Sequence, residues 1–383
     1  MADANSGNNN SGAANASGGE VQIQIPAKVE GSATQEAPSR SSGVKNWRWW
    51  LVVAAEVLFL IAGETSATLL GRYYYDQGGC SKWMFTFVQT AGFPILFFAL
   101  FFFPSKSYTG ANGGSSDTPM AKIALIYIVL GLIIAADDML YANGLIYLSA
   151  STYSLICTSQ LPLNVVFSYV LNSQKLTTLI LNSVVLLTLS ASLLGINERS
   201  QGPAGVSTGR YLLGFLLTLG ASATYSLTLS LMQLTFENVI KKHTFSAVIN
   251  MQIYTSLVAT FASLVGLFAS GEWRDLKGEM DRFHSGEFSY LMTLVWSAVA
   301  WQVASLGAVG LVFEVSSLFS NATTILALPV VPLFAVIVFH DKMEAVKVII
   351  LLIAIWGYFS YLCQHYLDDK KARKAISNTQ GNP

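Results

Sequence analysis

Ten apolar stretches of about twenty residues run from Trp47 to Tyr366, each bounded by charged residues or by turns rich in glycine and proline. A helix rises about 1.5 Å per residue, so about 20 apolar residues cross a hydrocarbon layer of about 30 Å with every backbone hydrogen bond made internally. Little chain remains between the stretches for a soluble domain. The sequence therefore predicts an all-α integral membrane protein with ten transmembrane helices.

The expected helices follow one another with short connections. They span residues 47–71, 82–104, 121–145, 148–171, 177–196, 210–236, 245–270, 288–312, 315–339 and 346–366. An even number of spans puts both termini on one side of the membrane, and lysine and arginine are slightly more numerous at the helix ends facing that side. We therefore expect a multi-pass protein with both termini in the cytoplasm. The plasma membrane is the expected location, with an endomembrane as the alternative.

Composition excludes several other classes. The chain is 52% hydrophobic and 11% charged, against roughly 25% charged residues in soluble domains. Its 22 basic and 22 acidic residues cancel, so no basic field is present to attract nucleic acid. Cys80, Cys157 and Cys363 are too few and too scattered for a disulfide framework or a zinc site. We expect neither a metal nor a cofactor.

The chain divides into four segments. Residues 1–45 are rich in glycine, serine and asparagine and predict a disordered N-terminal tail, and residues 369–383 form a short basic C-terminal tail. Between them, residues 46–200 and 201–368 look like two copies of one unit. Several residues recur 166 positions later, namely Gly144, Leu145 and Thr158 as Gly310, Leu311 and Thr324. Five helices in each copy force opposite orientations in the membrane, which is the inverted five-plus-five plan of secondary transporters.

Prolines inside the apolar stretches predict bends. Gly92 with Pro94, Pro162, and Pro329 with Pro332 are placed where a carrier that opens alternately to each side needs them. Packing is the competing role for these residues.

Carboxyl groups inside a membrane are candidates for function, because an ionised carboxylate in hydrocarbon costs at least about 2.5–3.5 kcal/mol. Glu64 lies in the middle of the first stretch, and Asp137 and Asp138 lie toward the end of the third. Asp138 is three residues before Tyr141 and shares its helix face. We interpret Glu64 or Asp138 as the proton carrier, the alternatives being interhelical hydrogen bonds for Glu64 and contact with interfacial water for the aspartates.

Amide and aromatic side chains supply candidate contacts to a planar heterocycle. Gln160 and Asn164 are four residues apart on one helix face, and an amide pairs a donor with an acceptor as an adenine edge does. Tyr141 and Trp296 are expected to stack on the ring. The predicted binding set is completed by Gln302, Asn321 and Gln89. Amides also bridge membrane helices without any ligand, so a structural role stays open.

Several blocks of sequence resemble the plant purine permease family of the drug/metabolite transporter superfamily, over about residues 46–370. The blocks are RYYYDQGG at Arg72–Gly79, TAGFP at Thr90–Pro94, STYSLICTSQL at Ser151–Leu161, NSQKLTTLILNSVVLLT at Asn172–Thr188, VSSLFSN at Val315–Asn321 and WGYFSYLCQHYLDD at Trp356–Asp369. The resemblance implies ten helices, cytoplasmic termini, and proton-coupled uptake of adenine-like bases, cytokinins or related small nitrogen heterocycles.

Two alternative functions remain open at this point. One is a drug/metabolite carrier of another small molecule, such as an alkaloid or a vitamin; a nucleotide sugar is disfavoured, because no span holds an internal lysine or arginine to meet phosphate. The other is a membrane enzyme that uses Asp137 and Asp138 to hold a magnesium diphosphate. Such chemistry needs a further acidic motif and basic residues near the pair, and neither is present. We therefore expect a transporter and not an enzyme.

Overall fold

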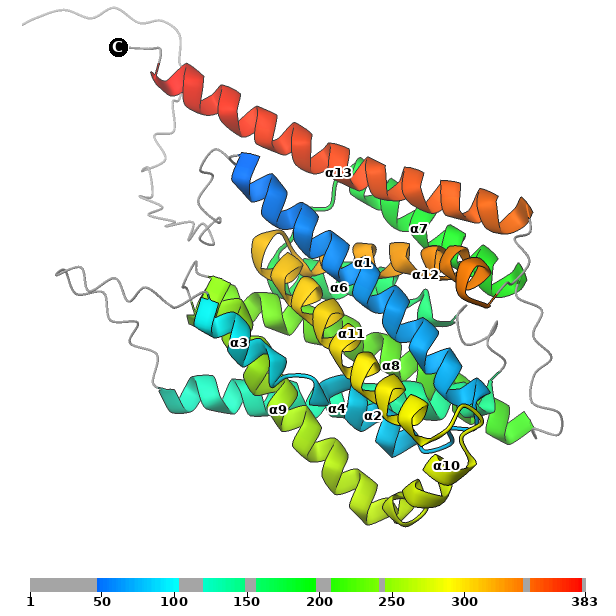
Figure 1. Ribbon diagram of the computed structural model, residues 1–383. Coiled ribbons are helices and arrows are strands. Elements are labelled where there is room, and N and C mark those ends of the chain that lie inside the picture. Colours follow the sequence, from blue (N-terminus) through cyan, green and yellow to red (C-terminus); the bar gives the residue numbers. More distant parts are fainter. Residues whose placement is uncertain are drawn as a thin grey trace, which may run out of the picture. The chain divides into compact units, whose positions relative to one another are not determined.

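The computed structural model describes residues 47–102, 120–148, 156–197, 208–240, 245–339 and 345–380, all helical apart from turns and short connections. The tail expected over residues 1–45 lies outside these ranges. The helices are α1 (Trp47–Asp76), α2 (Lys82–Ala91), α3 (Ile95–Phe102), α4 (Met120–Tyr147), α6 (Gln160–Asn172), α7 (Thr178–Asn197), α8 (Thr208–Thr235), η1 (Phe236–Ile240), α9 (Phe245–Ser270), η2 (Glu272–Arg274), α10 (Leu276–Arg282), α11 (Glu287–Glu314), α12 (Ser317–Phe339) and α13 (Ala345–Gln380) (Figure 1).

Seven of the described helices are long and apolar enough to cross a membrane. They are α1, α4, α8 with η1, α9, α11, α12 and the first part of α13. Large apolar side chains such as Leu58, Phe98 and Phe261 are more than half exposed on the helices. An apolar outer surface is expected where the surrounding solvent is lipid rather than water. The chain is therefore an all-helical, multi-pass membrane protein.

Two of the expected spans, 82–104 and 148–171, are interrupted near Gly92, Pro94 and Pro162, as the prolines in them predicted. The first is split into α2 and α3 around Gly92 and Pro94, and in the second α6 begins only at Gln160, two residues before Pro162. Proline has no N–H to donate to the carbonyl four residues earlier, which is Thr90 in the first case and Thr158 in the second. Each break therefore lies where one helical hydrogen bond cannot form.

Two other expectations about helix ends were wrong. Pro329 and Pro332 do not interrupt α12, which runs through both of them to Phe339. The last helix does not end near residue 366, because α13 continues to Gln380 through most of the segment expected as a C-terminal tail. That segment is rich in alanine, lysine and arginine, which favour helix even outside the membrane.

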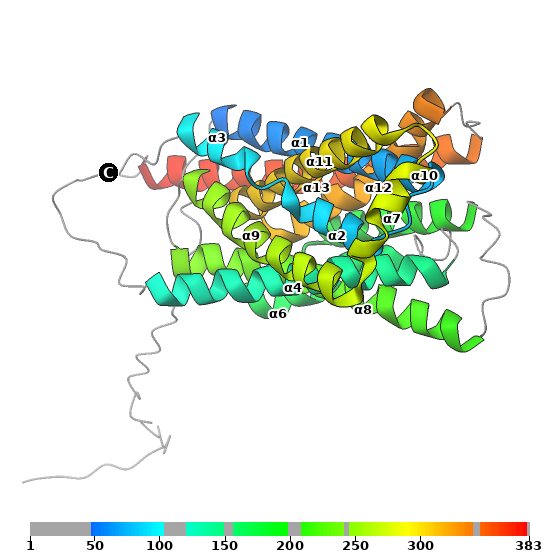
Figure 2. The ribbon, with the colours of Figure 1, turned by 60° about the horizontal axis from the view of Figure 1, so that its bottom comes forward.

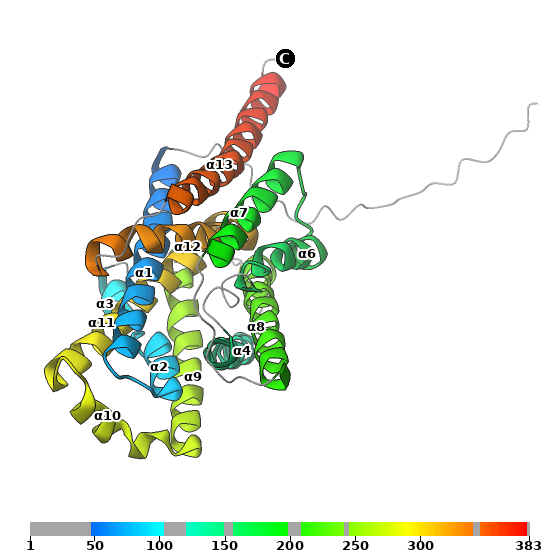
Figure 3. The same cartoon turned by 90° about the vertical axis from the view of Figure 1, so that its right-hand side faces the viewer.

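Helices from distant parts of the sequence pack in pairs. α1 lies along α11, α7 along α13, and α4 along α8 and α9, while α6 and α12 also contact α8 (Figures 1 and 2). Figure 3 shows α6 and α4 beside α8. The α1–α11 contact depends on glycine: a Cβ on Gly307 would lie 2.6 Å from the backbone oxygen of Glu56. Small residues let membrane helices approach closely, and dispersion then holds them together.

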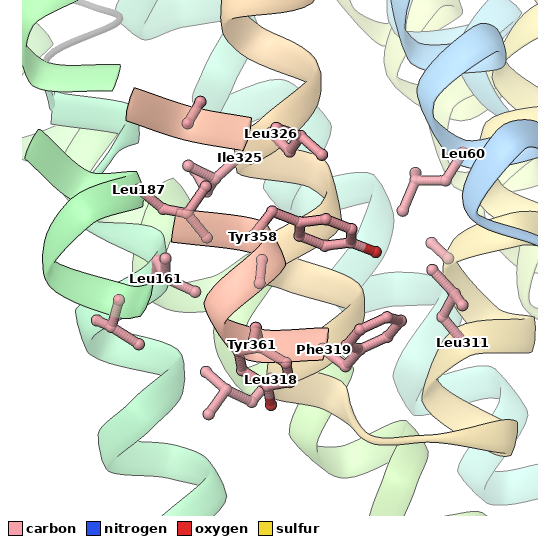
Figure 4. Close-up of a cluster of buried hydrophobic side chains, with 14 of the residues drawn as sticks. Leu60, Leu161, Leu187, Leu311, Leu318, Phe319, Ile325, Leu326, Tyr358 and Tyr361 are labelled. Carbon is pink, nitrogen blue, oxygen red and sulfur yellow. The ribbon is translucent and has the colours of Figure 1, made fainter. Parts of the chain in front are cut away.

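The largest apolar core joins six helices. It contains Leu60 of α1, Leu161 of α6, Leu187 of α7, Leu311 of α11 and Phe319 of α12, together with two tyrosines of α13 (Figure 4). The rings of Phe319 and Tyr361 have centroids 5.4 Å apart. This core fixes the direction in which α6 and α12 present their polar faces, and those faces carry the site.

Candidate functional site

A cluster of polar side chains lies where α4, α6, α8 and α12 meet. The Tyr141 hydroxyl donates to Gln160 Oε1 at 3.3 Å and to Ser222 Oγ at 3.4 Å. The backbone carbonyl of Gln160 accepts from Ser226 Oγ at 2.6 Å and from Asn321 Nδ2 at 3.1 Å. We call Tyr141, Gln160, Ser222, Ser226, Tyr225, Asn321 and Thr324 the central polar cluster. Three predicted residues, Tyr141, Gln160 and Asn321, thus come together here.

Asn164 lies one turn beyond Gln160 but is used differently. It is 0% exposed, and both ends of its amide are hydrogen-bonded. Its Nδ2 donates to the carbonyl of Ser226 at 3.3 Å, and its Oδ1 accepts from Ser168 Oγ at 2.7 Å. Ser168 Oγ also lies 3.0 Å from Ser317 Oγ. Asn164 therefore ties α6 to α8 and, through Ser168, to α12.

The candidate proton carriers lie beside this cluster. The hydroxyl of Tyr225 lies 3.2 Å from Thr324 Oγ1, and it interacts electrostatically with the carboxyls of Glu64, Asp137 and Asp138. Glu64 and Asp138 are half-buried, whereas Asp137 is only 5% exposed. The sequence argument favours Asp138, and the structure places its neighbour deeper in the protein.

The carboxyls have no basic counterpart at mid-membrane depth. In the seven described apolar spans, every arginine and lysine lies in the first or last two turns of the span. Nor do the described residues contain a group of three or more metal-ligating side chains.

Gln302 belongs to a separate network. Its Nε2 donates to the carbonyl of Thr90 at 3.3 Å and to Ser256 Oγ at 3.2 Å, while its Oε1 accepts from Gln252 Nε2 at 3.4 Å. Thr90 is the residue whose carbonyl loses a helical donor at Pro94, so Gln302 replaces that donor from α11. We call Thr90, Gln252, Ser256 and Gln302 the Gln302 network.

The other two predicted residues do not join the central polar cluster. Trp296 is 58% exposed on the outward side of α11, as expected of a tryptophan in contact with lipid. Gln89 is half-buried on α2, one residue before Thr90 of the Gln302 network. An open groove of about 440 Å³ lies near Trp83, Leu132, Met139 and Ala262. Its lining is mostly apolar, with Asn143 as the amide among the lining residues.

Sequence reasoning missed several residues of this region. Ser222, Ser226 and Ser230 are fully buried on α8 and spaced four apart, so the helical period of these hydroxyls was the signal that could have found them. Glu56 was missed as well, although it lies inside the first span as Glu64 does. It is 4% exposed and packs directly against Gly310 of α11.

Comparison with known proteins places the chain in a family. The family model for purine nucleobase transmembrane transport matches residues 51–371. The chain belongs to this family. Its membership confirms the predicted resemblance and the prediction that the chain is not an enzyme.

Relatives within this purine nucleobase transport family cover almost the whole chain. One is probable purine permease 11 of Arabidopsis thaliana, 54% identical over 94% of this chain and 95% of the relative. Another is purine permease 21 of the same plant, 51% identical over 90% of this chain and 88% of the relative. A solved crystal structure that is 13% identical has a TM-score of 0.52 over 84% of this chain and 98% of the other, which shows a similar fold only.

Proposed function

We propose that the protein is a secondary active transporter that carries purine-type bases, cytokinins or related small nitrogen heterocycles across the plasma membrane together with protons. The observation that carries this proposal is family membership over residues 51–371 combined with a polar cluster buried among four helices. Another small metabolite, such as an alkaloid or a vitamin, is the alternative cargo. Competition by such compounds against the uptake of labelled adenine would rank it.

Helix pairing supports an inverted five-plus-five repeat of residues 46–200 and 201–368. In this repeat α8 corresponds to α1, α9 to α2, α11 to α4 and α12 to α6. The contact of α1 with α11 then corresponds to the contact of α8 with α4. The contact of α1 with α12 likewise corresponds to that of α8 with α6. The repeated glycines fit this exchange, because Gly144 of α4 packs against Thr218 of α8 and Gly310 of α11 packs against Glu56 of α1. Ten spans with both termini on one side follow from this plan, and the bias of lysine and arginine favours the cytoplasmic side.

In the proposed site, Gln160, Tyr141 and Asn321 bind the base. The Tyr141–Gln160 bond of 3.3 Å is long for a hydroxyl donor, so exchanging it for a bond to a purine edge costs little. The side chains of Gln160 and Tyr141 would supply an acceptor and a hydroxyl to the same ring edge. Tyr141 also offers its aromatic face for stacking.

Glu64 or Asp138 carries the proton in this proposal. Both are half-buried beside Tyr225, and no cation of the described spans neutralises them at that depth. Uptake of labelled adenine into cells that express the protein should exceed uptake by vector controls, and it should fall when the proton gradient is collapsed. Unlabelled competitors rank the cargo. Absence of uptake for every purine base and cytokinin would remove the proposed cargo, and uptake that ignores the gradient would remove coupling.

The Glu64→Gln variant tests the carrier itself. Glutamine keeps the shape and hydrogen bonding of a protonated carboxyl but cannot release a proton. We expect loss of gradient-driven accumulation, while exchange of labelled for unlabelled base across the membrane continues. Asp138→Asn should behave this way instead if Asp138 is the carrier. If accumulation stays as large as in the wild type and still depends on pH in both variants, neither residue is the carrier.

A further inference from the structure

The buried carboxyl of Asp137 lies in the contact between α4 and α8. Leu130, Asp137 and Gly144 are spaced seven apart and therefore share one face of α4. Leu130 packs in a core cluster with Leu229 of α8, and Gly144 packs against Thr218 of α8. The two helices run antiparallel here, so Asp137 faces α8 about midway between these two contacts.

Tyr225 lies close to that midpoint of α8, and Asp137 interacts electrostatically with it. Asp137 is 5% exposed, and its Oδ1 has no hydrogen-bond partner among the described residues. The titratable groups that interact with it are Asp138 on its own helix and Tyr225 on α8, and Tyr225 also interacts with Glu64 of α1. Two other helices that contact α4 add titratable groups only at a distance: on α9, Tyr254 stacks on Tyr127 about three turns away, and on α2, Lys82 lies at the helix start.

These neighbours decide the charge of Asp137. An ionised carboxylate with an oxygen that accepts nothing would lose its hydration without compensation. Asp138 lies next to it in the chain, so ionising both carboxyls would place two negative charges side by side. No lysine or arginine of the described spans lies at that depth. Only the neutral acid fits this position.

We propose that Asp137 holds a proton while α4 and α8 are packed as seen here, and that it releases this proton when the two helices part during transport. Asp137 is then a second proton site, distinct from the half-buried carriers Glu64 and Asp138. The inference rests on the proposed coupling of transport to protons. Its first half, the protonated state of Asp137, is independent of that coupling.

Infrared spectroscopy of the purified full-length protein in lipid nanodiscs tests the first half. A protonated carboxyl has a C=O stretching band apart from that of carboxylates and shifts in deuterated water. At neutral pH we expect such a band in the wild type and in Asp281→Asn, which neutralises an exposed carboxyl of α10. The band should lose intensity in Asp137→Asn. An unchanged band in folded Asp137→Asn would overturn the inference.

Transport by proteoliposomes tests the second half. Each coupled proton contributes about tenfold to the accumulation ratio per unit of pH gradient. We expect Asp137→Asn to lower the accumulation ratio for adenine by that factor, with counterflow exchange still measurable and Asp281→Asn like the wild type. An unchanged ratio and proton stoichiometry would make Asp137 a permanently neutral packing residue. A wild type whose uptake ignores the gradient would instead refute the proposed coupling, whatever the infrared result.

Discussion

At the scale of single residues, two glutamines of the same chemistry have different surroundings. Gln160 shares its side-chain oxygen with the half-buried hydroxyl of Tyr141, whereas Gln302 is 1% exposed and bonded to Thr90, Ser256 and Gln252. Truncating an amide that binds the base leaves a buried polar group of the base unmatched, which costs about 1–3 kcal/mol. We expect Gln160→Ala to raise the Michaelis constant for the preferred base roughly 5- to 150-fold.

Gln302→Ala is the matched control for that prediction. It removes the same side chain from the Gln302 network, so it should lower thermal stability or the maximal rate while the Michaelis constant stays near that of the wild type. Surface expression of both variants is measured in parallel. Equal changes of the Michaelis constant in the two variants would contradict the separate roles, and a normal constant in Gln160→Ala would make its polar face structural.

At the scale of elements, two carboxyl groups fasten the connection between α9 and α11 to the start of α2. Glu272 of η2 accepts from Ser81 Oγ at 2.8 Å and from the N–H of Trp83 at 3.1 Å. Glu279 of α10 is 1% exposed and accepts hydrogen bonds from the hydroxyls of Tyr74 and Tyr290, from the N–H of Ser81 at 3.0 Å and from Cys80 Sγ at 3.3 Å. Ser81 is the N-cap of α2, and its Oγ accepts from Met84 N. Charge-assisted bonds to these two carboxyl groups hold the helix ends in register.

The reactivity of the Cys80 thiol is a measure of its contact with Glu279. Burial raises the pKa of this thiol, and so does its hydrogen bond to Glu279. The reactive thiolate is therefore scarcer at neutral pH than for a free cysteine, and alkylation should accelerate as pH rises through the raised pKa. In a background with Cys157→Ser and Cys363→Ser, we expect Glu279→Gln to speed maleimide labelling at neutral pH, because the charge that opposes the thiolate is gone.

Asp281→Asn serves as control, since that carboxyl lies exposed on the same helix. It should leave the labelling rate unchanged. If Glu279→Gln labels no faster than the parent protein at any pH, then Glu279 does not govern the Cys80 thiol.

At the scale of the whole molecule, the proposed ten spans fix which segments face the same side. Tags placed at Ala2 and Pro383 should both resist protease in sealed, right-side-out cells, whereas the exposed Cys80 should react with a maleimide that cannot cross membranes. Permeabilised cells, in which both tags become accessible, are the control. Digestion of one tag alone in intact cells would rule out an even number of spans.

The apolar stretches themselves predicted most of the helix positions. Seven of the expected spans recur as long apolar helices, because spanning a bilayer is a local requirement on length and hydropathy. Breaks were harder to place: Pro94 and Pro162 coincide with interruptions, but Pro329 and Pro332 lie within a continuous α12. Whether a proline ends a helix depends on what the neighbouring helices offer to the freed carbonyl, and a linear sequence does not contain that information.

The sequence by itself determined that this is a helical membrane protein, where most of its spans lie and which family it resembles. The tertiary structure decided which polar residues meet: Gln160 with Tyr141 and Asn321, but Gln302 with Gln252. It also buried Asp137 more deeply than Asp138. The physical reason is that length and hydropathy act within one helix, whereas the rotation of each helix about its axis is set by glycine contacts and side-chain packing with partners far away in the chain.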